Sequence, residues 1–392
     1  MEESDTIQKV LNKILNNPNI NEVNKKYAKD TVRYLQLRKS DYKTIYKWLY
    51  CLNIFFNDLP PVNKLNKTDI EEFVIKLNNS NYGEPTKTKI EIVVKAFFKH
   101  FFGDDVYVPK EVAWIKINRN PNKKILSTDL LTEEDVRTLI NTANNIRDKT
   151  IISLLYDTGI RAGELLNMKV KDVDLESTPQ HIQIDGKTGK RQIAIVLSVP
   201  YLSQYFNTYK NLKSEEYLWQ NMAQSHFKGR LTEPGLLVMI KRVGEDSKIN
   251  KRIYPHLFRH SRATHLSKSN KISTQQLNKY FGWKNSSTMV DTYISLSGKD
   301  TDDAILEANG IKINTQPSKL QNKICPKCTF INGIDSIYCS RCSQALDTST
   351  AIYDLEMKKK SFDTFSKLIE DPKNFENLIH EYLLHKKRIK NI

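Results

Sequence analysis

The sequence predicts a mainly α-helical protein with one small β-hairpin, arranged as two large domains and a short cysteine-rich unit. Three observations lead to this prediction. Apolar residues recur at helical spacing in several long stretches of the chain. Large apolar residues recur at every second position on both sides of a glycine-containing turn within residues 181–197. Four of the five cysteines lie together within residues 325–342.

The composition suits a protein of two or three domains with a polyanionic partner. The chain has 392 residues, and 39% of them are hydrophobic, so it can bury substantial cores. The formal net charge of +16 favours the phosphates of nucleic acid, although a lysine-rich proteome would give the same charge. The N-terminus MEESDTIQKV lacks the apolar segment of a signal peptide, and no run of about 18 apolar residues predicts a membrane span. We therefore expect a cytoplasmic protein with no membrane partner.

Residues 1–102 are predicted to form a compact helical domain. The segment Asp41–Phe56 has apolar side chains at helical spacing, and Lys87–Phe102 is a second amphipathic segment with several lysines on its polar side. Between them, Thr68 is predicted to cap a helix, with Glu71 completing a capping box. The basic faces of these helices suit either a DNA backbone or plain solvent.

Residues 103–124 are predicted to be a linker, because they contain two prolines and end in a basic cluster. The domain beyond it opens with a helix whose cap is Thr132, paired with Asp135 in a capping box. A buried helix around Ile151–Tyr156 follows, and Gly159 is predicted to break it.

Arg161 comes just after this glycine turn, at the start of the next predicted helix. Backbone N–H groups at a helix N-terminus attract anions. Glu164, one turn further on, can hold the guanidinium in place. A plain surface ion pair is the alternative, but the preceding glycine and the apolar flanks argue against it. Arg161 is therefore a candidate anion-binding residue.

The segment His181–Leu197 predicts a β-hairpin, because its apolar residues alternate on both sides of a GKTG turn. The turn region presents Lys187, Lys190 and Arg191. A basic tip of this kind can reach into a groove or towards a leaving group, although such tips are more often only solvated turns.

The stretch Tyr254–Tyr293 groups side chains that suit an anion. His256 and Arg259 lie three positions apart on one predicted helix, so they share a face. Trp283 supplies an indole N–H donor, and Tyr293 supplies a phenol on a later helix. Two donors one helical turn apart can grip one anion, which the phenol can then attack.

The cysteine-rich unit contains two CxxC pairs with ten residues between them. They are formed by Cys325, Cys328, Cys339 and Cys342. Four thiolates at this spacing predict a structural zinc ribbon over residues 322–348, and two pairs occurring together make a redox role a poorer explanation. Contact of the ribbon with DNA and contact with protein both remain open.

Four motifs together resemble the tyrosine recombinase (phage integrase) family. They are LLYDTGIRAGELLNM, the DGKTGKR hairpin, PHLFRHSRATHL, and FGW followed by a tyrosine. Because they stand in the family's order and roughly its spacing, the resemblance implies a mixed α/β catalytic domain over residues 125–312. It also identifies residues 1–102 with the family's SAM-like core-binding domain, which binds DNA. The tail after Tyr293 and the cysteine-rich element are similar to archaeal integrases of mobile elements.

The resemblance also implies roles for single residues. The catalytic residues that it implies are Arg161, Lys187, His256, Arg259, Trp283 and Tyr293. Lys187 would protonate the leaving 5′-oxygen, with Lys190 as a possible substitute, and Tyr293 would be the nucleophile. Trp283 stands where most members have a second histidine, and the interval from Trp283 to Tyr293 is one residue longer than the commonest form.

The implied function is site-specific recombination of double-stranded DNA through a covalent 3′-phosphotyrosyl intermediate. No catalytic metal and no ATP are expected for strand exchange, and a homo-oligomer, a tetramer in the synaptic complex, is expected on nucleoid DNA. The alternatives are a non-catalytic DNA-binding protein of the same fold and a type IB topoisomerase. The complete set of site residues argues against the first. Three features argue against a type IB topoisomerase: the sequence around the GELL and HxxR motifs, the archaeal-like tail and the zinc ribbon.

Residues 350–392 are predicted to be a helical tail that packs against a neighbouring protomer. The prediction depends on an apolar stripe at helical spacing. The stripe consists of Phe375, Leu378, Ile379, Tyr382 and Leu383.

Overall fold

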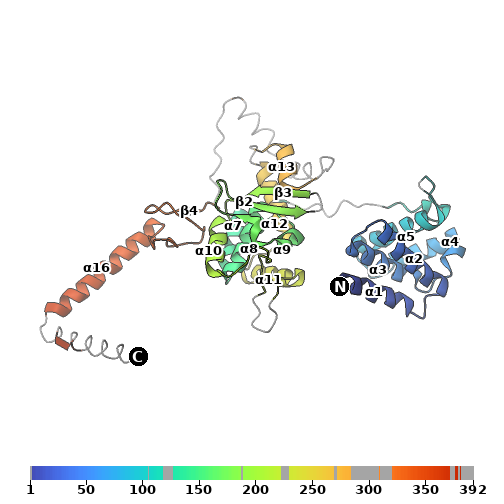
Figure 1. Cartoon of the computed structure of the whole chain (residues 1–392), viewed down its shortest axis with the longest axis horizontal. Coiled ribbons are helices and arrows are strands. Elements are labelled where there is room, and N and C mark those ends of the chain that lie inside the picture. The colour runs from blue at the N-terminus through green and yellow to red at the C-terminus, as the bar shows by residue number, and fades with distance from the viewer. Residues whose placement is uncertain are drawn as a thin grey trace. The chain divides into compact units, whose positions relative to one another are not determined.

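A computed structural model of the chain divides into two compact units, Met1–Lys124 and Ile125–Ile392 (Figure 1). The residues that it describes are 2–104, 106–117, 127–186, 189–221, 229–268, 272–283, 309, 320–370, 376, 377 and 380. Within these residues the chain is mainly helical with small sheets, which confirms the predicted fold class.

The first unit is helical throughout its described part. Its helices are α1 (Glu2–Leu15), α2 (Glu22–Leu37), α3 (Tyr42–Phe56), the 3-10 turn η1 (Val62–Lys64), α4 (Lys67–Asn78), α5 (Glu84–Phe102) and α6 (Lys110–Ala113). Asp41 caps α3 by accepting a hydrogen bond from the Thr44 N–H, so the predicted helix over Asp41–Phe56 is confirmed. Phenylalanines of α3, α4 and α5 meet edge to face in the core, as Phe55 does with Phe73.

The predicted cap of α4 was wrong by two residues. Asn66, not Thr68, caps this helix, because its side chain accepts from the backbone N–H groups of Thr68 and Asp69. Asp69, not Glu71, completes the capping box by accepting from the Asn66 N–H at 2.8 Å. Asparagine and threonine both cap helices well, so residue type alone does not decide between positions 66 and 68.

The segment predicted as a linker, residues 103–124, includes a helix that packs on the first unit. Val112 of α6 is fully buried and Ile115 is 3% exposed, both in the same core as α3 and α5. The side chain of Lys95 donates to the carbonyls of Ala113 and Ile115. The chain therefore stays attached to the helical unit as far as residue 117, and residues 118–126 lie outside the described part.

The second unit contains a main helical core, a smaller hydrophobic cluster between α12 and α13, a small antiparallel sheet and the cysteine-rich unit. Its helices are η2 (Ser127–Asp129), α7 (Glu133–Thr142), α8 (Ile146–Thr158), α9 (Ala162–Asn167), η3 (Val170–Asp172), α10 (Val199–Thr208), α11 (Glu233–Asp246), α12 (Pro255–Lys268), α13 (Thr274–Phe281) and α16 (Thr348–Glu370). Its strands are β1 (Val173–Asp174), β2 (His181–Gly186), β3 (Gly189–Ala194), β4 (Lys323–Ile324) and β5 (Ile331–Asn332).

Helix α8 lies at the centre of this unit (Figure 1), and α7, α10 and α12 pack on it. Its residues from Thr150 to Thr158 are all buried. The capping box of Thr132 and Asp135 at the start of α7 is present as predicted. The predicted hairpin is also present: β2 and β3 pair from His181 with Ala194 to Gly186 with Gly189. The β3 strand contacts α13, the helix that ends at the first residue of the FGW motif.

Candidate active site

The turn between α8 and α9 places Arg161, and it requires glycine at position 159. Gly159 ends α8 with φ +58°, in the left-handed region where a side chain is strained. A Cβ atom there would lie 2.5 Å from Cε1 of Phe281. Gly159 therefore lets α8 turn sharply and lets α13 approach the turn. The prediction that a helix breaks here is confirmed.

Arg161 is the N-cap residue of α9 and is held by Glu164. Its backbone N–H donates to Oε2 of Glu164 at 3.1 Å, and its Nη1 donates to Oε1 at 2.8 Å. The Arg161 side chain is 37% exposed, so the guanidinium still faces solvent. Its Nη2 lies 3.4 Å from the carbonyl oxygen of Gly282.

Arg259 comes from α12 and reaches the same turn from the other side. Its side chain is almost fully buried, and it donates to the Gly159 carbonyl at 2.7 Å and to the Phe281 carbonyl at 2.6 Å. The guanidinium lies over the rings of Phe281 and Trp283, which stack on each other. The two arginines thus bond to the carbonyls of adjacent residues, Phe281 and Gly282.

His256 stands at the first turn of α12 and has solvent access. Its ring meets the ring of His260 edge to face at 4.4 Å. Protein packed around the imidazole removes part of its water, and this desolvation lowers the pKa of His256; the positive charges of Arg259 and Arg161 lower it further. The neutral imidazole, which can accept a proton, is therefore favoured near neutral pH.

Four side chains that sequence analysis did not single out organise the turn before Arg161. Asp157 is the hub: its Oδ2 accepts from the Val196 N–H and from the N–H and hydroxyl of Ser198, all within 3.0 Å. Its backbone carbonyl accepts from Nε of Arg262 at 3.0 Å and from the Tyr280 hydroxyl at 2.7 Å. The end of α8 is thereby tied to the segment after the hairpin, to α12 and to α13. No periodicity in the sequence reveals this hub, because its partners lie far apart along the chain.

The described residues bring four of the six predicted catalytic positions to one place. Arg161, His256, Arg259 and Trp283 surround the turns at residues 159–161 and 281–283. Lys187 and Tyr293 lie outside the described residues. Two guanidinium groups, a neutral imidazole and an indole can together bind an anion with a tetrahedral arrangement of oxygens.

The four cysteines of the C-terminal unit fit a tetrahedral metal ion. Their sulfur atoms all lie within 4.8 Å of one another. Sγ of Cys325 is 3.5 Å from that of Cys342, and Sγ of Cys328 is 3.6 Å from that of Cys339. Zinc–sulfur bonds of about 2.3 Å in a tetrahedron separate the sulfurs by about 3.8 Å, so the donor set fits zinc.

This cysteine unit is docked on the helical core of the second unit. Ile334, between the two CxxC pairs, is 2% exposed and belongs to the main core. Asp335 forms an ion pair with Lys149 of α8 and accepts a hydrogen bond from the Tyr201 hydroxyl of α10 at 2.8 Å. A Cβ atom on Gly333 would lie 2.7 Å from the Tyr201 ring, which shows how closely the two parts approach.

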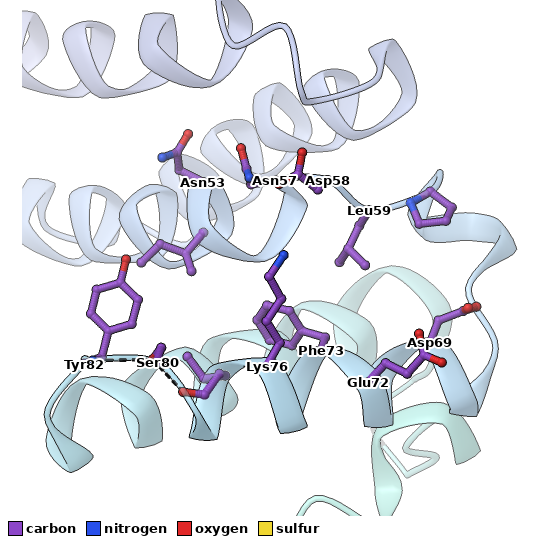
Figure 2. Close-up of a pocket in the computed structure, with 13 residues that line it drawn as sticks. Asn53, Asn57, Asp58, Leu59, Asp69, Glu72, Phe73, Lys76, Ser80 and Tyr82 are labelled. Carbon is purple, nitrogen blue, oxygen red and sulfur yellow. Dashed lines mark hydrogen bonds between the residues drawn. The ribbon is translucent and has the colours of Figure 1, made fainter.

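A groove of about 570 Å³ on the first unit, between α3 and α4, is unsuited to phosphate (Figure 2). Leu59 and Phe73 project into it. Its lining contains three carboxylates and one lysine, namely Asp58, Asp69, Glu72 and Lys76. Because this excess of negative charge repels phosphate, we expect nucleic acid to bind elsewhere on the helical unit. Among the described helices, none is both long and apolar enough to span a bilayer.

Comparison with known proteins agrees with this geometry. Residues 129–299 match the phage integrase family, and this range contains the two turns at residues 159–161 and 281–283. The tyrosine recombinase XerA of Pyrococcus horikoshii is 29% identical over 293 residues, which cover 74% of this chain and 96% of that protein. Residues 129–299 therefore form a domain of the phage integrase family, and the chain is similar to tyrosine recombinases over about three quarters of its length. It is accordingly an enzyme of the site-specific recombinase type, and the two alternative functions are not favoured.

Other tyrosine recombinases extend the comparison. XerD of Staphylococcus haemolyticus is 35% identical over 146 residues, which cover 35% of this chain and 48% of that protein. The Tn1549 transposon integrase in complex with transposon right end DNA shares the fold, with a TM-score of 0.56 and 16% identity over 72% of this chain and 99% of that one. A lambda integrase tetramer bound to a Holliday junction also shares it, with a TM-score of 0.54 and 15% identity over 70% of this chain and 77% of that one.

Proposed function

We propose that this recombinase cuts and rejoins double-stranded DNA through a covalent 3′-phosphotyrosyl intermediate, with Tyr293 as the nucleophile. One observation carries the proposal. Arg161 and Arg259 come from different helices and bond to carbonyls of adjacent residues, so their guanidinium groups converge on one small region. Two convergent guanidinium groups fit the two non-bridging oxygens of a single phosphodiester.

The arginines act on the transition state more than on the bound DNA. When a phenol oxygen attacks the phosphorus, negative charge grows on the non-bridging oxygens. Donors that are already oriented stabilise that charge without reorganising. Arg259 is oriented by two backbone carbonyls and two aromatic rings, and Arg161 by Glu164. The indole N–H of Trp283 is proposed as a further donor to a phosphate oxygen.

The proposed step balances protons as well as charge. The bond from phosphorus to the Tyr293 oxygen forms while the bond to the 5′-oxygen breaks. His256, favoured in its neutral form, accepts the phenol proton, and Lys187 donates a proton to the leaving 5′-oxygen, with Lys190 as the alternative donor. The phosphotyrosyl bond keeps the free energy of the broken linkage, so a 5′-hydroxyl from another duplex can reverse the step without ATP.

The proposed partner is DNA, bound by a homo-oligomer. The formal charge of +16 supports a phosphate-rich partner. Solved relatives of the same fold include an integrase on transposon DNA and a lambda integrase tetramer on a Holliday junction, which supports a tetramer in the synaptic complex. We also propose that the protein serves an archaeal mobile element and acts at the nucleoid, and that the tail over residues 350–392 contacts a neighbouring protomer.

The four clustered cysteines are proposed to hold one structural zinc ion. Their thiolates complete a tetrahedral ligand set, and such a closed set leaves no coordination site for substrate. The ion would stabilise the small unit that carries Ile334 and Asp335, which has little apolar core of its own. This role is separate from the phosphate chemistry.

A nicked suicide DNA substrate tests the nucleophile. After cleavage such a substrate loses the 5′-end needed for religation, so the enzyme stays attached to DNA through a covalent bond. The wild type is expected to accumulate this adduct, and the Tyr293→Phe variant is expected to bind the DNA without forming it. Tyr254→Phe is a control from the same domain and should form adduct normally. Equal adduct formation by Tyr293→Phe would contradict the assignment.

A further inference from the structure

Arg191 of the hairpin is buried against the active site, although its position near a basic turn suggested a solvated side chain. Its side chain is 7% exposed, and it lies on β3 opposite Ile184 of β2. Its Nη2 donates to Oε2 of Glu164 at 2.8 Å, and its Nη1 lies 3.2 Å from Oε1. The guanidinium thus grips Glu164 with both terminal nitrogens.

Glu164 is therefore shared by two arginines. Oε1 also accepts from Nη1 of Arg161, and Oε2 also accepts from the Arg161 backbone N–H. Burial alone would raise the pKa of Glu164, but the hydrogen bonds from Arg191 and Arg161 outweigh it and hold the pKa below its usual value. The carboxylate stays ionised, with Arg161 on one side and Arg191 on the other.

The charge balance of this cluster matters for an anion site. A carboxylate paired with Arg161 alone would neutralise it, so that little positive field would remain for a phosphate. With Arg191 present, two positive charges face one negative charge, and the cluster keeps one net positive charge. Arg161 is the exposed member of the cluster. The net positive charge is therefore accessible to a ligand.

The hairpin is built to reach this carboxylate. A Cβ atom on Gly186, the last residue of β2, would lie 2.5 Å from Oε1 of Glu164 and 3.1 Å from Nη1 of Arg191. The strand end therefore passes directly beside the shared carboxylate. A glycine is required at this point because any side chain would displace one of the two arginine contacts.

We propose that Arg191 is a positioning residue of the scissile-phosphate site. It holds Glu164 in the orientation that aims Arg161, and it offsets the charge of Glu164 so that the charge of Arg161 remains available to the phosphate. The proposal rests on the proposed phosphotyrosyl chemistry, and Arg191 itself does not touch the DNA.

A neutral substrate distinguishes this role from a merely structural one. In a methylphosphonate, a methyl group replaces one non-bridging oxygen, so the reacting centre loses its negative charge but can still be attacked by a phenol. A variant that loses positive charge at the site should react slowly with the phosphodiester and nearly normally with the methylphosphonate. A variant that is only loosely folded should lose rate on both substrates.

The test measures single-turnover adduct formation on saturating nicked DNA that carries either linkage. For Arg191→Gln we expect a fall of about 30-fold on the phosphodiester, below the roughly 100-fold or more that loss of a direct donor costs. On the methylphosphonate the fall should be less than about threefold, by the charge argument above. Arg191→Lys keeps the positive charge but not the two terminal nitrogens of the guanidinium, and it should recover most of the rate on the phosphodiester.

Arg147→Gln is the matched control. Arg147 is also buried and donates two hydrogen bonds to a carboxylate, that of Asp148. After Arg147→Gln, Asp148 would still be paired with Arg242. In the same way, Glu164 would still be paired with Arg161 after Arg191→Gln. This control should affect both substrates by the same factor. Equal losses on both substrates for Arg191→Gln, or no recovery by Arg191→Lys, would overturn the proposal.

A second comparison keeps the proposal testable if Arg191→Gln folds poorly. Glu164→Gln removes the negative charge that Arg191 offsets. In that background, adding Arg191→Gln should lower the rate of adduct formation on the phosphodiester by less than about threefold, because the effects of coupled residues are not additive. Additive losses would contradict the shared-carboxylate role. Failure of the wild type to form any adduct would instead refute the phosphotyrosyl chemistry itself, so the two failures are distinguishable.

Discussion

The two arginines of the candidate active site are oriented by different kinds of partner. Arg259 is nearly buried, and carbonyl oxygens of Gly159 and Phe281 hold it, which orients the guanidinium without cancelling its charge. Arg161 is held by a carboxylate, which would cancel its charge if Arg191 did not share that carboxylate. At the scale of single residues, the site is therefore arranged to keep positive charge and fixed orientation together.

Two histidines of α12 are held neutral, which gives a pH dependence of stability. Burial lowers the pKa of His260 to about 4, with His256 and Arg259 adding to the effect, and burial also lowers the pKa of His265 to about 4. In the unfolded chain each would titrate near the ordinary value of about 6.5. Between those values the unfolded state binds more protons, so the free energy of unfolding falls as pH falls from about 6.5 to 4.

We predict that His265→Gln reduces this acid sensitivity. The glutamine amide can still bond to the Tyr156 hydroxyl, which lies 2.6 Å from Nδ1 of His265, but it does not titrate. Between pH 7 and pH 5 the variant should lose about 1–2 kcal/mol less of its unfolding free energy than the wild type does, by the linkage relation. Urea unfolding at both pH values measures the difference. His181→Gln controls for loss of an imidazole, and an unchanged pH slope in His265→Gln would contradict the prediction.

At the scale of elements, the turn at Gly159 joins α8, α9, α12 and α13. The backbone there adopts φ +58°, its carbonyl accepts from Arg259, and its Cα faces the Phe281 ring. A side chain at this position would strain the turn and push α13 away from α8 at the same time.

We predict that Gly159→Ala lowers stability by about 2–4 kcal/mol, the combined cost of a strained left-handed residue and overpacking. It should also slow adduct formation, because Arg161 and Arg259 both depend on this turn. Gly163→Ala is the matched control: an added Cβ meets nothing within 4 Å and the residue is helical, so alanine should be neutral or stabilising. Thermal unfolding of the two variants checks the contrast, and equal melting temperatures would contradict it.

The elements that sequence predicted well are those specified by neighbouring residues. The capping box of α7, the end of α8 at Gly159 and the hairpin each depend on residues of one short continuous stretch of chain. The cap of α4 was placed wrongly because Asn66 and Thr68, two positions apart, are both residue types that cap helices well. Arg191 and Asp157 were missed as site residues because their partners lie at least 27 positions away along the chain, and only the tertiary structure brings them together.

At the scale of the whole molecule, the cysteine unit is part of the second unit's core. Ile334 is buried among the core residues, and Asp335 bonds to α8 and α10. Burial of one isoleucine contributes about 1.5–3 kcal/mol, and the polar contacts add to it. A fold of the cysteine unit that depends on metal would therefore make the stability of the recombinase core depend on metal as well.

We predict that removing the metal lowers the melting temperature of the core by several degrees, since about 2–3 kcal/mol of docking would be lost. The measurement is calorimetry of the full chain with and without a strong chelator, with the released metal quantified. In an Ile334→Ala, Asp335→Asn double variant the contacts between the cysteine unit and the core are already weakened. The core of this variant should therefore have a lower melting temperature before chelation, and chelation should change that temperature little. If chelation leaves the wild-type core unchanged while releasing metal, the cysteine unit folds independently and its contacts with α8 and α10 do not stabilise the core. A large chelator effect that persists in the double variant would mean that the metal acts on the core by another route.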